Sequence, residues 1–424
     1  MNNKQPFFTL WILMLLGVVL NGCGSDDDDN TISAQFSERT QRELETTVGQ
    51  LFQELGVPGM LVGLWVPNVG KWTQAYGVSN RETGEPMRAD QHVRIGSITK
   101  TFTVTLILQL QDAGLLNIND TLDRYFDTDP NSDKLTLAQP IPNADRITLK
   151  NLANMTSGLA SYTFDPDFQD AFFSNPLRQW QPQELVNIGI ANTIAGCPHA
   201  PPACFEPSTD WFYNNTNTVM LGLVVEKVSG KPYGELLRET ILEPLALRGT
   251  LKPTDNTLPE PVARGYTFQG LDDGQQQDAT DWNPSWGWGV GDLVSTFDDL
   301  RVWGKALGRG DLLNVETQAL RQEQVTVGEN QPGVNAYAIG MGYKRGWWGH
   351  GGEVPGYNTL TFYRPDLDAV VVVITNFDEL VNGIHPAYLV ADVIIDLVAK
   401  ESPMLGDFGE EQPIFIDDSL SEDD

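Results

Sequence analysis

Positive charge is scarce in this sequence. The 424 residues include 27 Lys and Arg against 57 Asp and Glu, so the formal net charge at pH 7 is −30. A surface this acidic repels the phosphates of DNA and RNA, and we expect no nucleic-acid partner. The sequence also lacks a His-Glu-x-x-His motif, a phosphate-binding loop and a dinucleotide fingerprint, so it implies no metal and no other cofactor.

The apolar run near the N-terminus, Phe7–Leu20, is too short for a comfortable membrane span. It follows Lys4 and leads directly into Leu20-Asn21-Gly22-Cys23, which resembles a bacterial lipoprotein signal. We therefore expect residues 1–22 to be a signal peptide and Cys23 to carry lipid after export. The alternative is an ordinary secretory signal with a coincidental cysteine. Gly24, rather than Asp, follows the cysteine, which favours the outer membrane, facing the periplasm, in a Gram-negative host.

Cysteine is rare, with three in the chain. Beyond Cys23, the other two are Cys197 and Cys204, seven positions apart in a Pro-rich loop. Export favours oxidation, so we expect a disulfide between them, which the chain-entropy model values at roughly 2–3 kcal/mol. A metal site made with His199 is the alternative, but the sequence offers no evident fourth ligand.

The order of predicted elements indicates a discontinuous α+β domain over residues 37–402. It follows an acidic tether at 23–36 and precedes an acidic tail at 403–424. The region from about 115 to 290 is rich in helices and loops. Helical periodicity, turn residues and β-branched runs predict the remaining elements. These are a helix from the Ser37 cap to Gly56, strands at Met60–Pro67, Lys71–Val78, Ala336–Met341, Asn358–Tyr363 and Val370–Thr375, and a last helix at Pro386–Ala399.

Ser97-Ile98-Thr99-Lys100 places a hydroxyl and an amine three residues apart. If Ser97 opens a helix, both side chains lie on one face, and the amine of Lys100 can accept the hydroxyl proton. Backbone N–H groups at the helix start would then face a developing oxyanion. The preceding Gly96 would allow a tight turn into the helix. Alone the pattern is weak, because a solvated lysine at an ordinary helix start fits it equally well.

Phe212-Tyr213-Asn214-Asn215 is the second motif. In an extended loop, Tyr213 and Asn215 point the same way. A phenol beside a cationic lysine has a lowered pKa, so Tyr213 is a candidate general base and acid. Asn215 can hold the lysine amine or a substrate amide. The alternative is a buried tyrosine followed by a helix-capping asparagine.

His350-Gly351-Gly352-Glu353 is the third motif, and its glycines would let a strand backbone approach a ligand closely. We expect His350 at the rim of the site, near its ordinary pKa of about 6.5, where a partial positive charge would meet a substrate carboxylate. The alternative is a glycine-rich hairpin with a surface histidine. The remaining candidates, His92 and His385, are interpreted as structural.

Together and in this order, the three motifs resemble those of the penicillin-recognising serine hydrolases. The Tyr-x-Asn and His-Gly-Gly forms resemble the branch that holds class C β-lactamases, D-alanyl-D-alanine carboxypeptidases, D-aminopeptidases and related esterases. The resemblance covers about residues 37–400, with supporting segments at Ile147–Leu159, Gly287–Thr296 and Arg364–Asn376. It implies a β-lactamase/transpeptidase-like fold, in which terminal helices flank an antiparallel sheet and a helical subdomain is inserted at about 115–290.

The resemblance also implies roles for the motif residues. Ser97 would attack a carbonyl, while Lys100 and Tyr213, as a coupled pair, would move the proton to the leaving group. The backbone N–H groups of Ser97 and Glu353 would form the oxyanion hole. Four residues would orient substrate: Asn215, His350, Gly351 and Gly352.

The substrate stays open among several classes. A monomeric hydrolase of D-amino-acid peptides, such as a carboxypeptidase on cell-wall stem peptides, is the first expectation. An esterase is second, since relatives that cleave peptides often carry Thr where Gly351 stands. A class C-like β-lactamase is third, since those enzymes usually carry Lys at position 350. A catalytically silent binding protein on this fold is the last alternative. A further open point is whether five tryptophans line the cleft or pack between subdomains: Trp282, Trp286, Trp288, Trp347 and Trp348.

Overall fold

The structure, a computed structural model, describes residues 35–191, 204–270, 274–327 and 334–399. The predicted signal peptide, Cys23, Cys197 and the acidic tail lie outside these residues, so the corresponding domain boundaries stay predictions. Cys204 is disulfide-bonded. None of the helices in the described ranges is long and apolar enough to cross a membrane.

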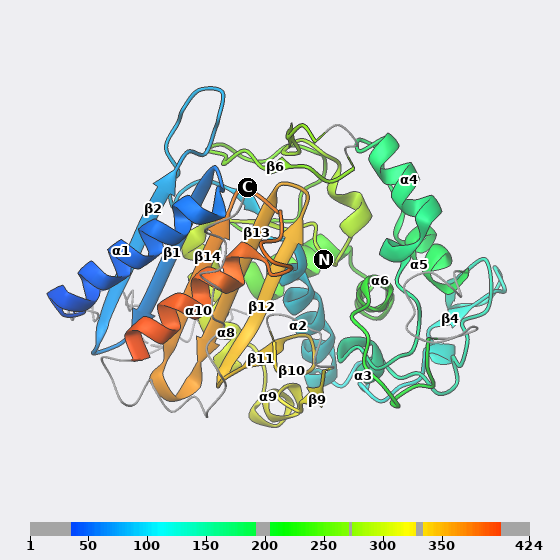
Figure 1. The fold of residues 1–424 in the computed structure, drawn as a ribbon. Coiled ribbons are helices and arrows are strands. Elements are labelled where there is room, and N and C mark those ends of the chain that lie inside the picture. The colour runs from blue at the N-terminus through cyan, green and yellow to red at the C-terminus, as the bar shows by residue number, and fades with distance from the viewer. Residues whose placement is uncertain (1–34, 192–203, 271–273, 328–333, 400–424) are drawn as a thin grey trace, which may run out of the picture.

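An eight-stranded antiparallel sheet forms the centre of one half of the molecule, in the order β2-β1-β14-β13-β12-β11-β10-β9 (Figure 1). Short two-residue strands pair outside it as β3 with β8, β4 with β5, and β6 with β7. The strands are β1 (Gly59–Val66), β2 (Gly70–Gly77), β3 (Val93–Arg94), β4 (Phe126–Asp127), β5 (Leu135–Thr136), β6 (Tyr266–Thr267), β7 (Gln277–Asp278), β8 (Val294–Ser295), β9 (Val325–Thr326), β10 (Ala336–Tyr337), β11 (Gly342–Lys344), β12 (Trp347–Val354), β13 (Tyr357–Arg364) and β14 (Ala369–Thr375).

Helices α1 and α10 cover one face of the sheet, α2 and α8 lie on the other, and a helical half lies beyond α2 (Figure 1). The predicted fold class is therefore confirmed. The helices are α1 (Glu38–Leu55), α2 (Thr99–Asp112), α3 (Leu149–Ala153), α4 (Pro166–Ser174), α5 (Pro182–Ala191), α6 (Asn215–Ser229), α7 (Tyr233–Leu237), α8 (Phe297–Arg309), α9 (Val315–Arg321) and α10 (Pro386–Ala399), with 3-10 turns at Gly96–Ile98, Leu122–Arg124, Tyr162–Phe164, Pro284–Gly287 and Pro365–Leu367 and a π-helical turn at Arg238–Leu242.

Strand β14 shows why the central strands are continuously apolar rather than alternating. Val370 and Val372 belong to the core on the α2 side, whereas Val371 and Val373 belong to the core under α1 and α10. Successive residues of a strand point to opposite faces, so a strand covered on both faces can bury apolar side chains at every position. The same alternation separates Trp347 from Trp348, which lie in different cores, so the five tryptophans do not form one cluster.

The ends of α1 follow their local chemistry as predicted. Ser37 is the N-cap, with its hydroxyl accepting a hydrogen bond from the backbone of Thr40, and Gly56 ends the helix in the left-handed conformation at φ 62°. The predicted strand at Ala336–Met341 is wrong in its second half. A turn closed by the Ala338 N–H and the Met341 carbonyl, 2.8 Å apart, separates β10 from β11. Gly340, at φ 75° and packed against α2, makes this turn.

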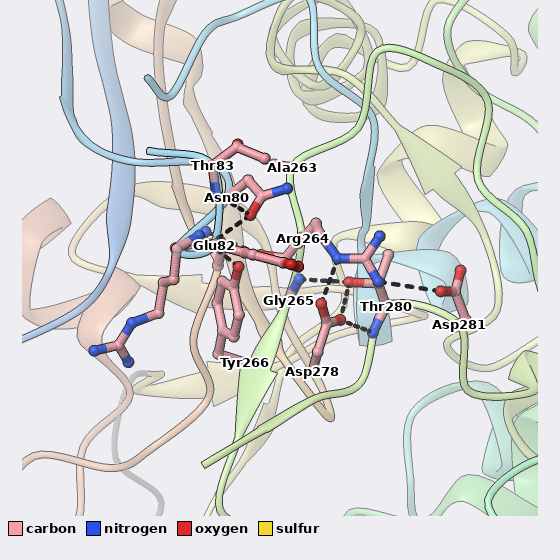
Figure 2. A network of polar contacts seen from close by, with 12 residues as sticks. Asn80, Glu82, Thr83, Ala263, Arg264, Gly265, Tyr266, Asp278, Thr280 and Asp281 are labelled. Atoms are coloured by element: carbon pink, nitrogen blue, oxygen red, sulfur yellow. Dashed lines mark hydrogen bonds and ion pairs between the residues drawn. The ribbon is translucent and has the colours of Figure 1, made fainter. Parts of the chain in front are cut away.

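A polar network holds β6 beside the sheet (Figure 2). Arg264 forms ion pairs with Asp278 and Asp281, and the Tyr266 hydroxyl accepts a hydrogen bond of 2.7 Å from the backbone of Arg81. The network ties the loop after β2 to the β6 and β7 pair. It thereby positions the segment that carries Gln269 next to the end of β12.

Candidate active site

The serine and lysine of the first motif lie together at the start of α2. Ser97 lies in the 3-10 turn Gly96–Ile98, and α2 begins at Thr99, so the serine precedes the α-helix rather than opening it. The Lys100 amine donates to the Ser97 hydroxyl at 2.8 Å and to the Val290 carbonyl at 3.3 Å. This arrangement places a nucleophile and a base in direct hydrogen-bond contact.

Lys100 has no exposed surface, which shifts its protonation toward the neutral amine. It is 0 % exposed, and burial lowers its pKa well below the ordinary value. Removing an ammonium ion from water favours the neutral amine, because the charged form loses the most solvation. A neutral amine has a free electron pair and can accept the proton of Ser97.

Tyr213 packs over the same amine, whose nitrogen lies 4.8 Å from the centre of the ring. Burial raises the pKa of Tyr213 well above its ordinary value, and the Ser97 hydroxyl beside it offsets only part of this rise. The expectation of a lowered phenol pKa is therefore wrong. It assumed a cationic lysine as neighbour, whereas Lys100 is buried and Tyr213 stays a protonated phenol.

Asn215 is the first residue of α6, and the neighbouring Asn214 is the helix cap. The Asn215 amide nitrogen donates to the Thr163 hydroxyl at 3.1 Å. Within the described ranges its side-chain oxygen is buried without a hydrogen-bond partner. A buried acceptor without a partner is suited to a donor from a substrate, such as an amide N–H.

His350 does not lie at an exposed rim. It is 6 % exposed on β12, and its Nε2 lies 3.0 Å from the Tyr337 hydroxyl while its Nδ1 contacts the Gly351 carbonyl. Burial lowers the pKa of His350 to about 3, because the charged imidazolium loses its solvation there. The predicted partial positive charge at neutral pH is therefore wrong, because the ring is enclosed and uses both nitrogens within the protein.

The glycines of β12 bring the strand against the nucleophile turn. A Cβ on Gly352 would lie 1.9 Å from the Ile95 carbonyl oxygen, and one on Gly96 would lie 2.5 Å from the Glu353 nitrogen. Both contacts are shorter than any side chain permits, so glycine is required at the two positions. Gly96 also has φ 52°, which suits glycine. The backbone of Glu353 is thus held beside Ser97.

Gly351 is not placed as expected for a residue that contacts substrate. Its N–H donates to the Tyr388 hydroxyl at 3.1 Å, and a Cβ there would lie 2.5 Å from the Tyr388 ring. Neither Tyr388 nor Tyr337 was among the sequence candidates. Neither tyrosine belongs to a sequence motif. Tyr388 reaches the site through the packing of α10, and Tyr337 through the packing of β10.

The surroundings of Glu353 are acidic. Burial raises its pKa to about 7, and Asp378 nearby adds to the rise. Its carboxylate contacts the Gln269 amide at 3.1 Å and His385 Nε2 at 3.2 Å. Burial lowers the pKa of His385 to about 4, so this histidine is neutral above that pH. His385 contacts the strand of the active site through Glu353, and its interpretation as structural stays a prediction.

These features define a class: a serine hydrolase-type fold of the penicillin-binding and β-lactamase kind, with Ser-x-x-Lys at the start of a buried helix and a glycine-rich strand beside it. The chain belongs to the Beta-lactamase family, which matches residues 44–394. The family predicted from the three motifs is confirmed. Within the described residues, no group of three or more His, Cys, Asp and Glu side chains could hold a metal ion.

Curated relatives include the Bacillus subtilis penicillin-binding protein 4*, 25% identical over 240 residues, which are 55% of this chain and 47% of the relative. A β-lactamase of Pseudomonas fluorescens is 27% identical over 227 residues, 54% of this chain and 55% of the relative. The chain thus spans about half the length of these relatives.

Among solved structures, a D-stereospecific amidohydrolase from Streptomyces is 30% identical with TM-score 0.67, covering 80% of this chain and 93% of its own. The D-amino acid amidase of Ochrobactrum anthropi SV3, with TM-score 0.70 and 23% identity over 86% of this chain and 98% of its own, shows the shared fold.

Proposed function

We propose that this protein hydrolyses amide or peptide bonds of D-amino-acid substrates through an acyl-enzyme on Ser97. The observation that carries the proposal is the 2.8 Å contact between the Ser97 hydroxyl and the fully buried amine of Lys100. The D-stereospecific amidohydrolase and D-amino acid amidase among the structural neighbours support the substrate class.

In the proposed mechanism, neutral Lys100 accepts the Ser97 proton as the oxygen attacks the carbonyl. The oxyanion binds to the backbone N–H groups of Ser97 and Glu353. Tyr213 is a protonated phenol whose ring lies 4.8 Å from the amine nitrogen, and we assign it the relay of the proton from Lys100 to the leaving group. The amine leaves, and water attacks the acyl-enzyme in a second step of the same kind. The Asn215 oxygen holds a substrate N–H.

The charge of the site favours a D-peptidase or amidase over a carboxypeptidase. A carboxypeptidase must bind a terminal carboxylate, and a β-lactam carries one too. Neutral His350 offers no positive charge for it, the N–H of Gly351 is engaged by Tyr388, and Glu353 is an acid. An esterase remains the second candidate. An uncharged ester needs no positive charge where the leaving group binds, and neutral His350 supplies none there.

The test begins with the intact mass of the protein after treatment with a fluorophosphonate or penicillin, with Ser97→Ala as control. A single adduct on the wild type, absent from Ser97→Ala, is expected. Turnover of D-amino-acid amides, D-Ala-D-Ala peptides and p-nitrophenyl esters then separates the candidates. Ser97→Ala should lose at least about a thousandfold in kcat/KM. A mutant that turns over like the wild type would refute the mechanism, and a protein that is never acylated would favour the silent binding protein.

We also propose that the protein is exported and anchored by lipid on Cys23. The proposal rests on the apolar run Phe7–Leu20 and the Leu-Asn-Gly-Cys sequence that ends it. Anchoring would place the hydrolase at a membrane surface.

A further inference from the structure

One edge of β12 lies open beside the nucleophile. On one side β13 pairs with β12 from Trp348 to Val354, whereas on the other side β11 pairs only with Trp347 to Gly349. In the described part of the chain, residues 350–354 therefore have no partner strand on that side. An open edge of this kind can pair with the backbone of an extended substrate.

The direction of each backbone group along this edge follows from the strand geometry. The Gly352 carbonyl accepts a hydrogen bond of 3.2 Å from the Asn358 side chain, so Gly352 faces β13. Backbone groups alternate in direction from one residue to the next along a strand. Gly351 and Glu353 therefore both present their N–H and carbonyl groups to the open edge.

The two positions of this edge differ in what occupies them. At Gly351 the N–H donates to the Tyr388 hydroxyl at 3.1 Å, and the carbonyl is in contact with Nδ1 of His350. Neutral His350 fits this arrangement, because Nδ1–H donates to the carbonyl while Nε2 accepts from Tyr337. The backbone groups of Gly351 are thus already bonded to side chains of the protein. The backbone of Glu353, by contrast, lies next to Ser97.

Tyr388 is held in place by the start of α10. The backbone N–H of Ala387 donates to the Asn358 side-chain oxygen at 2.9 Å, and the same asparagine bonds the Gly352 carbonyl. The Tyr388 ring packs edge-on against Phe362 with centroids 6.0 Å apart. The ring fills the space that a side chain at position 351 would need, since a Cβ there would lie 2.5 to 2.7 Å from its atoms.

The blocked position lies on the side of the leaving group. Tyr213, which donates the proton to the leaving group in the proposed mechanism, is close enough to Tyr388 and Glu353 that both raise its pKa. The Tyr213 ring also lies 6.0 Å from the ring of His350. A leaving group that departs past Tyr213 therefore meets His350, Gly351 and Tyr388.

We propose that Tyr388 determines specificity by occupying the strand edge at Gly351, so that the enzyme favours leaving groups without a peptide backbone, such as ammonia or a small alcohol. The acyl part of the substrate pairs with Glu353, whereas a leaving amino acid finds no free backbone partner. This inference rests on the proposed function and narrows its substrate class to simple amides and esters of D-amino acids.

The test compares two substrates with the same acyl group. D-Alaninamide releases ammonia, whereas D-alanyl-D-alaninamide cleaved at its peptide bond releases D-alaninamide, and product analysis distinguishes the two. The measured quantity is the ratio of kcat/KM for the peptide to that for the amide. Tyr388→Ala frees the N–H and the space and should raise this ratio about tenfold or more. Tyr388→Phe frees only the N–H and should raise it about two- to tenfold, the range of one hydrogen bond.

Tyr363→Phe is the matched control. It removes a tyrosine hydroxyl of the same sheet, which bonds Asp368 at 2.8 Å away from the site, and should leave the ratio unchanged. Equal losses on both substrates in the Tyr388 variants would show that Tyr388 only supports packing and would overturn the inference. A ratio within about twofold of the wild type would overturn it as well. Both results leave the proposed function standing, which fails instead if the wild type is never acylated at Ser97.

Discussion

Lys100 shows how burial of one residue sets up the chemistry. A lysine in water is cationic at neutral pH and cannot accept a proton. Here α2, Tyr213 and the Val290 carbonyl enclose the amine, and burial lowers its pKa well below the ordinary value. Burial thus favours the neutral form of the amine, which bonds directly to the Ser97 hydroxyl.

Replacing Lys100 by arginine tests this protonation state. A guanidinium stays protonated in proteins, so Lys100→Arg keeps a long basic side chain but removes the proton acceptor. We expect kcat/KM to fall about a thousandfold or more, measured with a D-amino-acid amide. Lys150→Arg is the control, because Lys150 pairs with the exposed Glu323 outside the site. Near-normal activity of Lys100→Arg would exclude Lys100 as the base.

His350 allows a test through the pH dependence of stability. Its pKa is about 3 in the folded protein and about 6.5 when unfolded. Below pH 6.5 the unfolded chain binds a proton that the folded protein refuses, so this residue makes stability fall as pH drops from 6.5 toward 3. Between pH 7 and pH 5, the wild type should lose about 2 kcal/mol more free energy of unfolding than His350→Asn, by denaturant titration.

The comparison with the variant isolates His350. Other groups with shifted pKa values, such as Glu353, Asp378 and His385, are present in both proteins and cancel in the difference. A stability difference that does not change with pH would mean that His350 takes up its proton over the same pH range in the folded protein as in the unfolded chain. The argument against a carboxypeptidase would then lose its basis.

At the scale of elements, the contact between β12 and the turn before α2 defines the site. Gly352 lets the strand approach the Ile95 carbonyl, and a Cβ there would lie 1.9 Å from that oxygen and 2.6 Å from the Thr359 hydroxyl. Gly352→Ala should therefore push β12 away from the nucleophile turn. We expect a loss of about 1–3 kcal/mol of stability, the range typical of overpacking, together with a lower kcat.

Gly49→Ala is the matched substitution. Gly49 lies within α1, where the nearest atom to a new Cβ is 3.8 Å away. Alanine favours a helix interior over glycine by roughly 0.5–1 kcal/mol, so this variant should be slightly more stable, with unchanged activity. Thermal unfolding and turnover of the two variants measure both effects. Equal stability of the two variants would show that β12 adapts to the added methyl group.

At the scale of the whole molecule, a substitution at Cys23 distinguishes a lipoprotein signal from an ordinary secretory signal. Cys23→Ser removes the thiol that would carry lipid while leaving the apolar run Phe7–Leu20 unchanged. The variant should move from the membrane fraction to the soluble fraction and incorporate no radiolabelled palmitate. A wild type without lipid label and with the same fractionation as the variant would support an ordinary secretory signal.

The sequence by itself determined the elements whose signals are local. Ser37 and Gly56 specify the ends of α1, and the β-branched run of β14 specifies a strand covered on both faces. The last helix has the predicted bounds, Pro386–Ala399. The three motifs identified the family, because a shared order of short motifs depends on residue types and not on packing.

Only the tertiary structure decided the charges and the boundaries of the site. A pKa depends on how much water distant segments exclude, so the lowered pKa values of Lys100 and His350 and the raised pKa of Tyr213 could not be predicted from their neighbours in sequence. Tyr388 is the clearest case. It lies 37 positions after Gly351, and no local pattern links the two residues. The docking of α10 on the sheet brings its hydroxyl to the strand edge, since long-range packing sets the distance between elements.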